Sequence, residues 1–286
     1  MRYVVANDSR SAVALLGEGG DCRVLAGGTD LLVQMKLNGA APDVVVDIKN
    51  IPGISSVNEE NGGFRIGAAV SGAIMGEHAA LKSMWPGVVE AVELIGSTQV
   101  QGRATMAGNL CNGSPAADSV PAQLAAQAVA RIEGPQGQRD LPVSALLKAP
   151  GQTNLGKAEF ISSIFLPARA ARSGDAYLRF IPRTEMDIAV VGASVSLSLD
   201  ESGVVIDAHV ALGAVAPTAL LVPDAAASLI GTKLDEAALA ACAAACSAAC
   251  SPIDDRRGTI EFRTKVAGVM ATRAAKIAYT RAGGTL

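Results

Sequence analysis

The sequence has 286 residues, more than one typical compact domain needs and enough for two hydrophobic cores. Half of the residues are apolar and 18% are charged, a balance that favours a packed globular protein over a disordered one. The formal net charge of −3 provides no excess of cations to neutralise a phosphate backbone. The composition therefore argues against a nucleic-acid-binding protein.

The sequence predicts a cytoplasmic protein with free thiols. The N-terminus lacks the continuous apolar run of a signal peptide, because the polar residues 7–10 follow only a few apolar ones. The longest weakly polar stretch, residues 237–250, is short and only mildly hydrophobic, so no membrane span is expected. Five cysteines, an odd number, fit reduced thiols better than a disulfide framework.

The first half of the chain alternates predicted strands with predicted helices. Residues 22–37 indicate a strand, a tight turn and a helix, and a further strand is expected at 44–48. A strand at 64–70 is followed by a largely helical stretch, 73–95, that is interrupted at Pro86. A second Gly-rich segment, 103–119, precedes a helical stretch from 120 to about 130.

The second half of the chain predicts a different arrangement. A strand at 159–166 ends at Pro167, and the polar connection at 168–175 is the expected domain boundary. Residues 177–215 alternate like antiparallel strands, with a hairpin turn at 201–203. Helices over about 235–250 and 260–281 close the chain.

Two Gly-rich turns, AGGTD at 26–30 and TMAGN at 105–109, are the strongest local signals for binding. Glycines let backbone N–H groups approach a phosphate closely and form a nest for anions. Neither turn matches the GxGxxG of a Rossmann site or the GxxxxGK[ST] of a P-loop. Taken singly, each turn is more simply explained as a turn without a binding role.

Three segments, in this order and at these separations, carry a specific resemblance: VLAGGTDLLVQMK, TMAGNLCNGSPAADS and YLRFIPRTEMDIAVVGA. Together they resemble the FAD-binding medium subunits of the xanthine oxidase and carbon monoxide dehydrogenase family of molybdenum hydroxylases. The C-terminal EFRTKVAGVMATRAA is similar to the closing helix of that family. The resemblance therefore covers essentially the whole chain.

The resemblance implies an α+β fold in two domains. A two-subdomain FAD-binding domain of the vanillyl-alcohol-oxidase (PCMH) type is expected over residues 1–170, with subdomains at about 1–54 and 55–170. A smaller C-terminal α+β domain of the carbon monoxide dehydrogenase flavoprotein type, with an antiparallel sheet and helices, is expected over residues 176–286.

The resemblance also implies that the pyrophosphate of FAD lies between the two Gly-rich loops. In the second loop Ala107 stands where the family commonly has glycine, so an extra methyl group must fit beside the phosphates. No catalytic residue and no metal ligand is expected on this chain. The expected cofactor-binding residues are Arg23, Val24, Leu25, Ala26, Gly27, Gly28, Thr29, Asp30, Ile95, Thr105, Met106, Ala107, Gly108, Asn109, Asp118, Ile161 and Arg179.

Several of these residues also have a plainer explanation. Asp118 could be the N-cap of the helix that begins near residue 120. Ile95 and Ile161 could be ordinary core residues. Arg179, and Arg183 after it, could be solvated surface charges instead of cations near the pyrimidine edge of the flavin.

Cys242, Cys246 and Cys250 recur at every fourth position, which would place three thiols along one face of a helix. Successive turns separate such thiols too far for all three to bind one ion, and cluster sites normally use loops with CxxC spacing. The pattern therefore favours a buried face of small residues over a metal site. Cys111 lies in the second motif, but a chain with only two histidines offers little for a Cys-His nucleophile.

The resemblance implies an electron-transfer subunit. Substrate would be oxidised on a large molybdopterin subunit, and electrons would pass through the 2Fe-2S clusters of a small iron–sulfur subunit to FAD and then to NAD, a quinone or dioxygen. A dimer of heterotrimers is the expected assembly. The alternatives are a stand-alone FAD-dependent oxidoreductase acting on a small molecule and a non-catalytic FAD carrier or assembly protein. The scarcity of His and Tyr offers few acid–base groups for the stand-alone enzyme.

Overall fold

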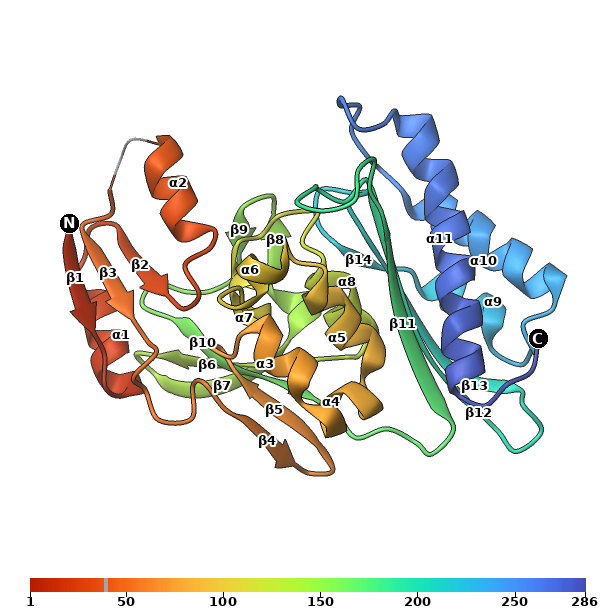
Figure 1. The fold of residues 1–286 in the computed structure, drawn as a ribbon, viewed down its shortest axis with the longest axis horizontal. Coiled ribbons are helices and arrows are strands. Elements are labelled where there is room, and N and C mark those ends of the chain that lie inside the picture. Colours follow the sequence, from red (N-terminus) through yellow and green to blue (C-terminus); the bar gives the residue numbers. More distant parts are fainter. Residues whose placement is uncertain (39–40) are drawn as a thin grey trace.

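The computed structural model describes residues 1–38 and 41–286, and it begins with a small parallel sheet. This sheet has the strand order β1-β3-β2, and a helix follows each of its first two strands (Figure 1). Parallel pairing brings the carboxyl ends of all three strands to one edge, the edge from which the first Gly-rich loop emerges. The elements are β1 (Arg2–Val5), α1 (Ser9–Gly17), β2 (Cys22–Leu25), α2 (Leu31–Asn38) and β3 (Val44–Asp47).

An antiparallel five-stranded sheet follows, with the strand order β4-β5-β10-β6-β7. Its strands are β4 (Val57–Glu60), β5 (Gly63–Gly67), β6 (Val129–Gly134), β7 (Gly137–Pro142) and β10 (Phe160–Leu166). The helices inserted between β5 and β6 are α3 (Gly72–Glu77), α4 (Ala79–Met84), α5 (Pro86–Glu93), α6 (Thr98–Gln101), α7 (Met106–Cys111) and α8 (Ser119–Ala125). A 3-10 helix, η1 (Val143–Leu146), and the hairpin of β8 (Leu147–Ala149) and β9 (Gln152–Thr153) complete this part.

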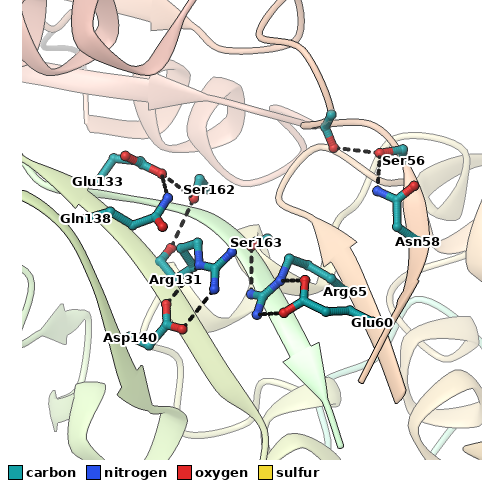
Figure 2. Close-up of polar contacts among 11 residues, drawn as sticks. Ser56, Asn58, Glu60, Arg65, Arg131, Glu133, Gln138, Asp140, Ser162 and Ser163 are labelled. Atoms are coloured by element: carbon teal, nitrogen blue, oxygen red, sulfur yellow. Dashed lines mark hydrogen bonds and ion pairs between the residues drawn. The ribbon is translucent and has the colours of Figure 1, made fainter. Parts of the chain in front are cut away.

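One face of the five-stranded sheet carries charges that are paired across neighbouring strands. Figure 2 shows Arg65 of β5 between Glu60 of β4 and Ser163 of β10, with 2.6 Å from Arg65 Nη2 to Glu60 Oε1. Arg131 and Asp140, which face each other across β6 and β7, are 2.9 Å apart. Exposed pairs of this kind contribute little to stability individually. Phe165 of β10 lies on this face too, under the Arg65 guanidinium, whereas the buried apolar side chains of the sheet, such as Phe64 and Ile66, point to its other face.

The last part of the chain forms a four-stranded antiparallel sheet, ordered β11-β12-β13-β14, with three helices on one face (Figure 1). The strands are β11 (Ser173–Phe180), β12 (Val191–Leu199), β13 (Val205–Gly213) and β14 (Leu220–Leu221). The helices are α9 (Pro223–Leu229), α10 (Glu236–Ala249) and α11 (Ile260–Arg281). Within residues 1–38 and 41–286, none of the helices combines the length and hydropathy that a membrane span requires.

Two hydrophobic cores account for most of the buried side chains. The first is built mainly from residues 6–166, and the second from residues 176–282. They meet at a seam where α5 and α8 pack against the face of β11, β12 and β13 that is opposite α11. The seam is unusually polar: Asp175 of β11 pairs with Arg169 at 2.6 Å and accepts the N–H of Val88 at 3.1 Å.

The structure corrects several predicted boundaries. The helical stretch 73–95 is broken at His78 as well as at Pro86, because the His78 side chain accepts the N–H of Leu81 and caps a new helix. The helix expected over 120–130 ends at Ala125. Two residues later, Gln127 adopts a left-handed conformation (φ 51°), and the chain then enters β6. The strand expected over 64–70 ends at Gly67, and the β6–β7 hairpin was not predicted. The helix at 260–281 has the predicted bounds.

Candidate functional site

The two Gly-rich loops lie on opposite sides of one pocket of about 230 Å³. The first loop connects β2 to α2, and the second begins α7. Ile48 and Ala68, which directly follow β3 and β5, and Phe160 of β10 contribute to the apolar part of the wall. Segments 75 residues apart in the sequence, which were predicted to act together, are therefore neighbours in the fold.

Most of the predicted cofactor-binding residues line this pocket. They are Arg23, Val24, Ala26, Gly27, Gly28, Thr29, Asp30, Ile95, Thr105, Ala107, Gly108, Asn109 and Ile161. Ile95 and Ile161 reach it while also packing against the first core. Ala107 lies in the first turn of α7, and it is buried in the wall of the pocket at 5% exposure.

Glycine is required where the two loops touch. A Cβ atom on Gly27 would lie 1.9 Å from the carbonyl oxygen of Arg103, far inside contact distance, so the loops meet backbone to backbone. Gly28 has a φ of +77°, a conformation that side chains other than glycine rarely adopt. Both glycines therefore serve to bring main chain, and its N–H groups, to the pocket.

Several of those N–H groups are free to bind a ligand. Within the described part of the chain, the N–H groups of residues 27–30 donate no hydrogen bond, and the same holds for Ala107 in the first turn of α7, whereas the Met106 N–H takes part in the bridge between Ser71 and Thr105. The Thr105 hydroxyl oxygen accepts the Gly108 N–H at 2.9 Å, so this N–H is already paired. Unpaired N–H groups on both sides of a cavity suit an anion with many oxygens, such as a diphosphate.

Sequence reasoning missed residues that complete the pocket wall. Gln34 of α2 donates to the side-chain oxygen of Asn112, just after α7, at 2.7 Å, and both residues line the pocket. Glu159 and Leu155 line it from the segment leading into β10. Helical spacing could have indicated Gln34 and Asn112, because each lies four residues beyond a predicted site residue, Asp30 and Gly108.

Four predicted residues lie outside the pocket lining: Leu25, Met106, Asp118 and Arg179. Met106 is buried in the first core, and Leu25 pairs with Asp47 at the end of β2. Asp118 forms a buried ion pair with Arg179 at 2.8 Å across the seam and accepts the Tyr177 hydroxyl at 3.0 Å. Burial raises the pKa of the Asp118 carboxyl to about 6, although Arg179 and Tyr177 act in the opposite direction.

The alternatives for three of these charged residues are decided by the contacts. Asp118 stands at the N-cap position of α8, as the plainer explanation expected, but its backbone is helical (φ −58°, ψ −41°) and its side chain caps no N–H of that helix. Arg179 is not a surface charge, since its side chain is only 5% exposed. Its Nε atom is buried without a partner in residues 1–38 and 41–286. Arg183 is a surface charge: its side chain is 68% exposed and pairs with Asp187.

The cysteine pattern belongs to the packing of the second core. Cys242 and Cys246 on α10 are fully buried, and Cys250 is half-buried. This agrees with the expected buried face of small residues. Cys111 lines the pocket, and all five cysteines are free.

Two protein families match the chain in succession. The FAD binding domain in molybdopterin dehydrogenase matches residues 1–169, and the CO dehydrogenase flavoprotein C-terminal domain matches residues 176–278. The carbon monoxide dehydrogenase medium chain of Hydrogenophaga pseudoflava is 34% identical over 271 residues, which are 94% of each chain. The putative xanthine dehydrogenase FAD-binding subunit of Escherichia coli K12 is 28% identical and covers 96% of this chain and 94% of its own length.

Solved structures agree with the sequence matches. A chain of carbon monoxide dehydrogenase from Hydrogenophaga pseudoflava, in a form lacking the Mo-pyranopterin moiety, superimposes with a TM-score of 0.94 at 35% identity. The superposition covers 98% of both chains. This chain therefore belongs to the family of FAD-binding medium subunits of molybdenum hydroxylases, and it is an oxidoreductase flavoprotein subunit with FAD as its cofactor.

Proposed function

We propose that this chain is the electron-transfer subunit of a molybdenum-containing hydroxylase complex. It passes electrons from the iron–sulfur clusters of a partner chain through FAD to an external acceptor such as NAD, a quinone or dioxygen. The observation that carries this proposal is a full-length match to chains named as medium chains, FAD-binding subunits and a subunit of a dehydrogenase complex. When bound, FAD accepts electrons singly and releases them as a pair, which suits a junction between clusters and a two-electron acceptor.

The residues present fit the diphosphate of FAD. The free N–H groups of residues 27–30 and of Ala107 belong to the two loops that line the pocket, and Gly27 and Gly28 keep side chains out of the cradle. In the proposed site these N–H groups bind the diphosphate oxygens, while Ile95 and Ile161 exclude water beside them.

Asp118 and Arg179 have a separate part in the proposal. They lie at the seam, where the buried Nε–H of Arg179 has no acceptor among the described residues. A cation held there by Asp118 would favour the anionic reduced form of a flavin beside it and so raise its electron affinity. Leu25 and Met106 act indirectly in this proposal, by fixing the ends of the two loops.

The domain organisation and the assembly form part of the proposal. Residues 1–170 constitute the FAD-binding domain, with subdomains at about 1–54 and 55–170, and residues 176–286 constitute the C-terminal domain. The two cores and the two matched families support this division. The complex is a dimer of heterotrimers with a small iron–sulfur subunit and a large molybdopterin subunit. Five free thiols fit a cytoplasmic location.

Copurification tests the proposal. Affinity-tagged full-length chain, expressed in its native cells, should retain two further chains, together with iron, molybdenum and FAD. The mass of the complex should correspond to two copies of each chain. A chain that binds FAD but copurifies with neither iron nor molybdenum would overturn the assignment of the partners and leave the FAD site standing.

A further inference from the structure

Three polar side chains, Tyr3, Asp47 and Lys49, cluster beneath the first Gly-rich loop. Asp47 is the last residue of β3, where it pairs with Val5 of β1 on one side and Leu25 of β2 on the other. It is only 4% exposed, although it lies at the edge of the sheet from which the loop emerges. A buried carboxylate at that edge requires partners, and the cluster supplies them.

Lys49 is the main partner of Asp47. The carboxylate accepts the backbone N–H of Lys49 at 2.9 Å and the Lys49 ammonium at 2.7 Å, and it also accepts the Tyr3 hydroxyl. Burial opposes ionisation of Asp47, but the hydrogen bonds from Lys49 and Tyr3 hold its pKa below the ordinary value. The carboxylate is therefore charged at neutral pH and fixes the position of the ammonium.

The ammonium of Lys49 also reaches the loop itself. It donates to the carbonyl oxygen of Ala26, the first residue of the loop, at 3.4 Å. The described part of the chain contains only trans peptide bonds. The Ala26 carbonyl and the Gly27 N–H therefore lie in one peptide plane and point in opposite directions. Because Lys49 holds the carbonyl on its own side, the Gly27 N–H points away from Lys49.

The pocket lies on that other side. Ala26 and Gly27 line it, and in the described residues Lys49 does not. We propose that Lys49, anchored by Asp47, is a positioning residue that orients the Ala26–Gly27 peptide so that the Gly27 N–H faces the diphosphate of FAD. This inference rests on the proposed placement of the diphosphate between the two loops. Because the Lys49 charge is balanced by Asp47, its role is orientation of the peptide.

The effect should be specific to the phosphate part of the cofactor. In full-length apo-protein, Lys49→Met should weaken the binding of FAD and of ADP roughly 10- to 150-fold, the loss expected for a hydrogen bond involving a charged group. The affinity for adenosine, which lacks phosphates, should not change. Lys49→Arg should restore FAD and ADP binding to within about threefold of the original chain, since a guanidinium can contact both Asp47 and a carbonyl oxygen. Isothermal titration of each variant gives the three affinities.

Lys82→Met is the matched control. Lys82 forms a similar pair with Glu93, at 2.8 Å, and its side chain is 47% exposed against 38% for Lys49. The control should bind all three ligands as the original chain does. Lys49→Met should unfold at a lower temperature than the control, because it removes a partner of the buried Asp47 carboxylate, so the affinities are measured well below both unfolding transitions. ADP affinities that are equal in Lys49→Met and Lys82→Met would overturn the inference. An equal loss of ADP and adenosine affinity in Lys49→Met would also overturn it, by showing a purely structural role.

The experiment separates this inference from the proposed site. If the original chain binds FAD and ADP and Lys49→Met binds them equally well, only the role of Lys49 falls. If the original chain binds FAD but not ADP, the diphosphate does not lie in this pocket, and both the proposed site and the inference fall.

Discussion

At the scale of single residues, the contact between the two Gly-rich loops is the most demanding feature. Gly27→Ala would place a Cβ 1.9 Å from the Arg103 carbonyl oxygen, so the loops must separate. We expect FAD affinity to fall by roughly tenfold or more. Overpacking should also lower the free energy of unfolding by about 1–3 kcal/mol. Fluorescence titration with FAD and urea unfolding measure the two effects.

Gly17→Ala is the control for this change. A Cβ on Gly17 would lie 3.7 Å from that of Ala158, an ordinary contact, so FAD affinity should stay at its original value. Equal affinities in Gly27→Ala and Gly17→Ala would contradict the placement of FAD between the loops.

The family resemblance of the sequence segments predicted one part of the candidate site and missed another. The loops could be predicted because each is a contiguous Gly-rich segment with its own motif, and the fold brings them to one pocket. The pair of Asp118 and Arg179 could not, because the partners are 61 residues apart and meet only where the two cores pack together. The triad of Tyr3, Asp47 and Lys49 was missed for the same reason, since it depends on strand register.

At the scale of elements, helices with strong end signals were predicted well and short ones were not. The helix α11 has the expected bounds, with Thr259 capping its first turn and Arg281 in its last. The division between α3 and α4 depends on one hydrogen bond from Leu81 to the His78 ring, which no periodicity indicates. The β6–β7 hairpin was missed because β7 is almost entirely polar and exposed, and therefore lacks an alternating pattern.

The helix α10 provides a test of its buried cysteine face. Replacing Cys242, Cys246 and Cys250 together by alanine should leave the metal content and the FAD content of the protein unchanged. Because Cys242 and Cys246 are fully buried, the free energy of unfolding should fall by about 1–3 kcal/mol through lost packing. Cys250→Ala alone, at a half-buried position, should cost much less. Loss of a bound metal or of FAD in the triple variant would show that the thiols are ligands.

At the scale of the whole molecule, the polar seam makes stability depend on pH. Burial raises the pKa of Asp175 from 3.8 to about 6, against the opposing effect of Arg169. Between these two values the folded chain binds more protons than the unfolded chain, so the contribution of Asp175 is present at low pH and is lost as the pH rises through about 6. From pH 5 to pH 7.5 this loss should lower the free energy of unfolding by about 1–1.5 kcal/mol.

Urea unfolding at pH 5 and pH 7.5 checks this expectation. In Asp175→Asn, the free energy of unfolding should not show the decrease from pH 5 to pH 7.5 that the Asp175 carboxyl contributes. Asp140→Asn is the control: Arg131 lowers the pKa of the Asp140 carboxyl, which is ionised at both pH values, so this variant should keep the original difference. A pH dependence in Asp175→Asn equal to that of the original chain would show that the seam carboxyl does not titrate in this range.

The most direct test of the proposed function is the source of the electrons that reduce the flavin. The FAD-loaded full-length chain is mixed anaerobically with a panel of small organic substrates, first alone and then with its iron–sulfur and molybdenum-containing partners. Reduction of the flavin is followed by its absorbance at about 450 nm. An electron-transfer subunit predicts flavin that stays oxidised in the chain alone and is reduced once both partners are present. Rapid bleaching by an organic substrate in the absence of any partner would contradict this account and identify a stand-alone dehydrogenase.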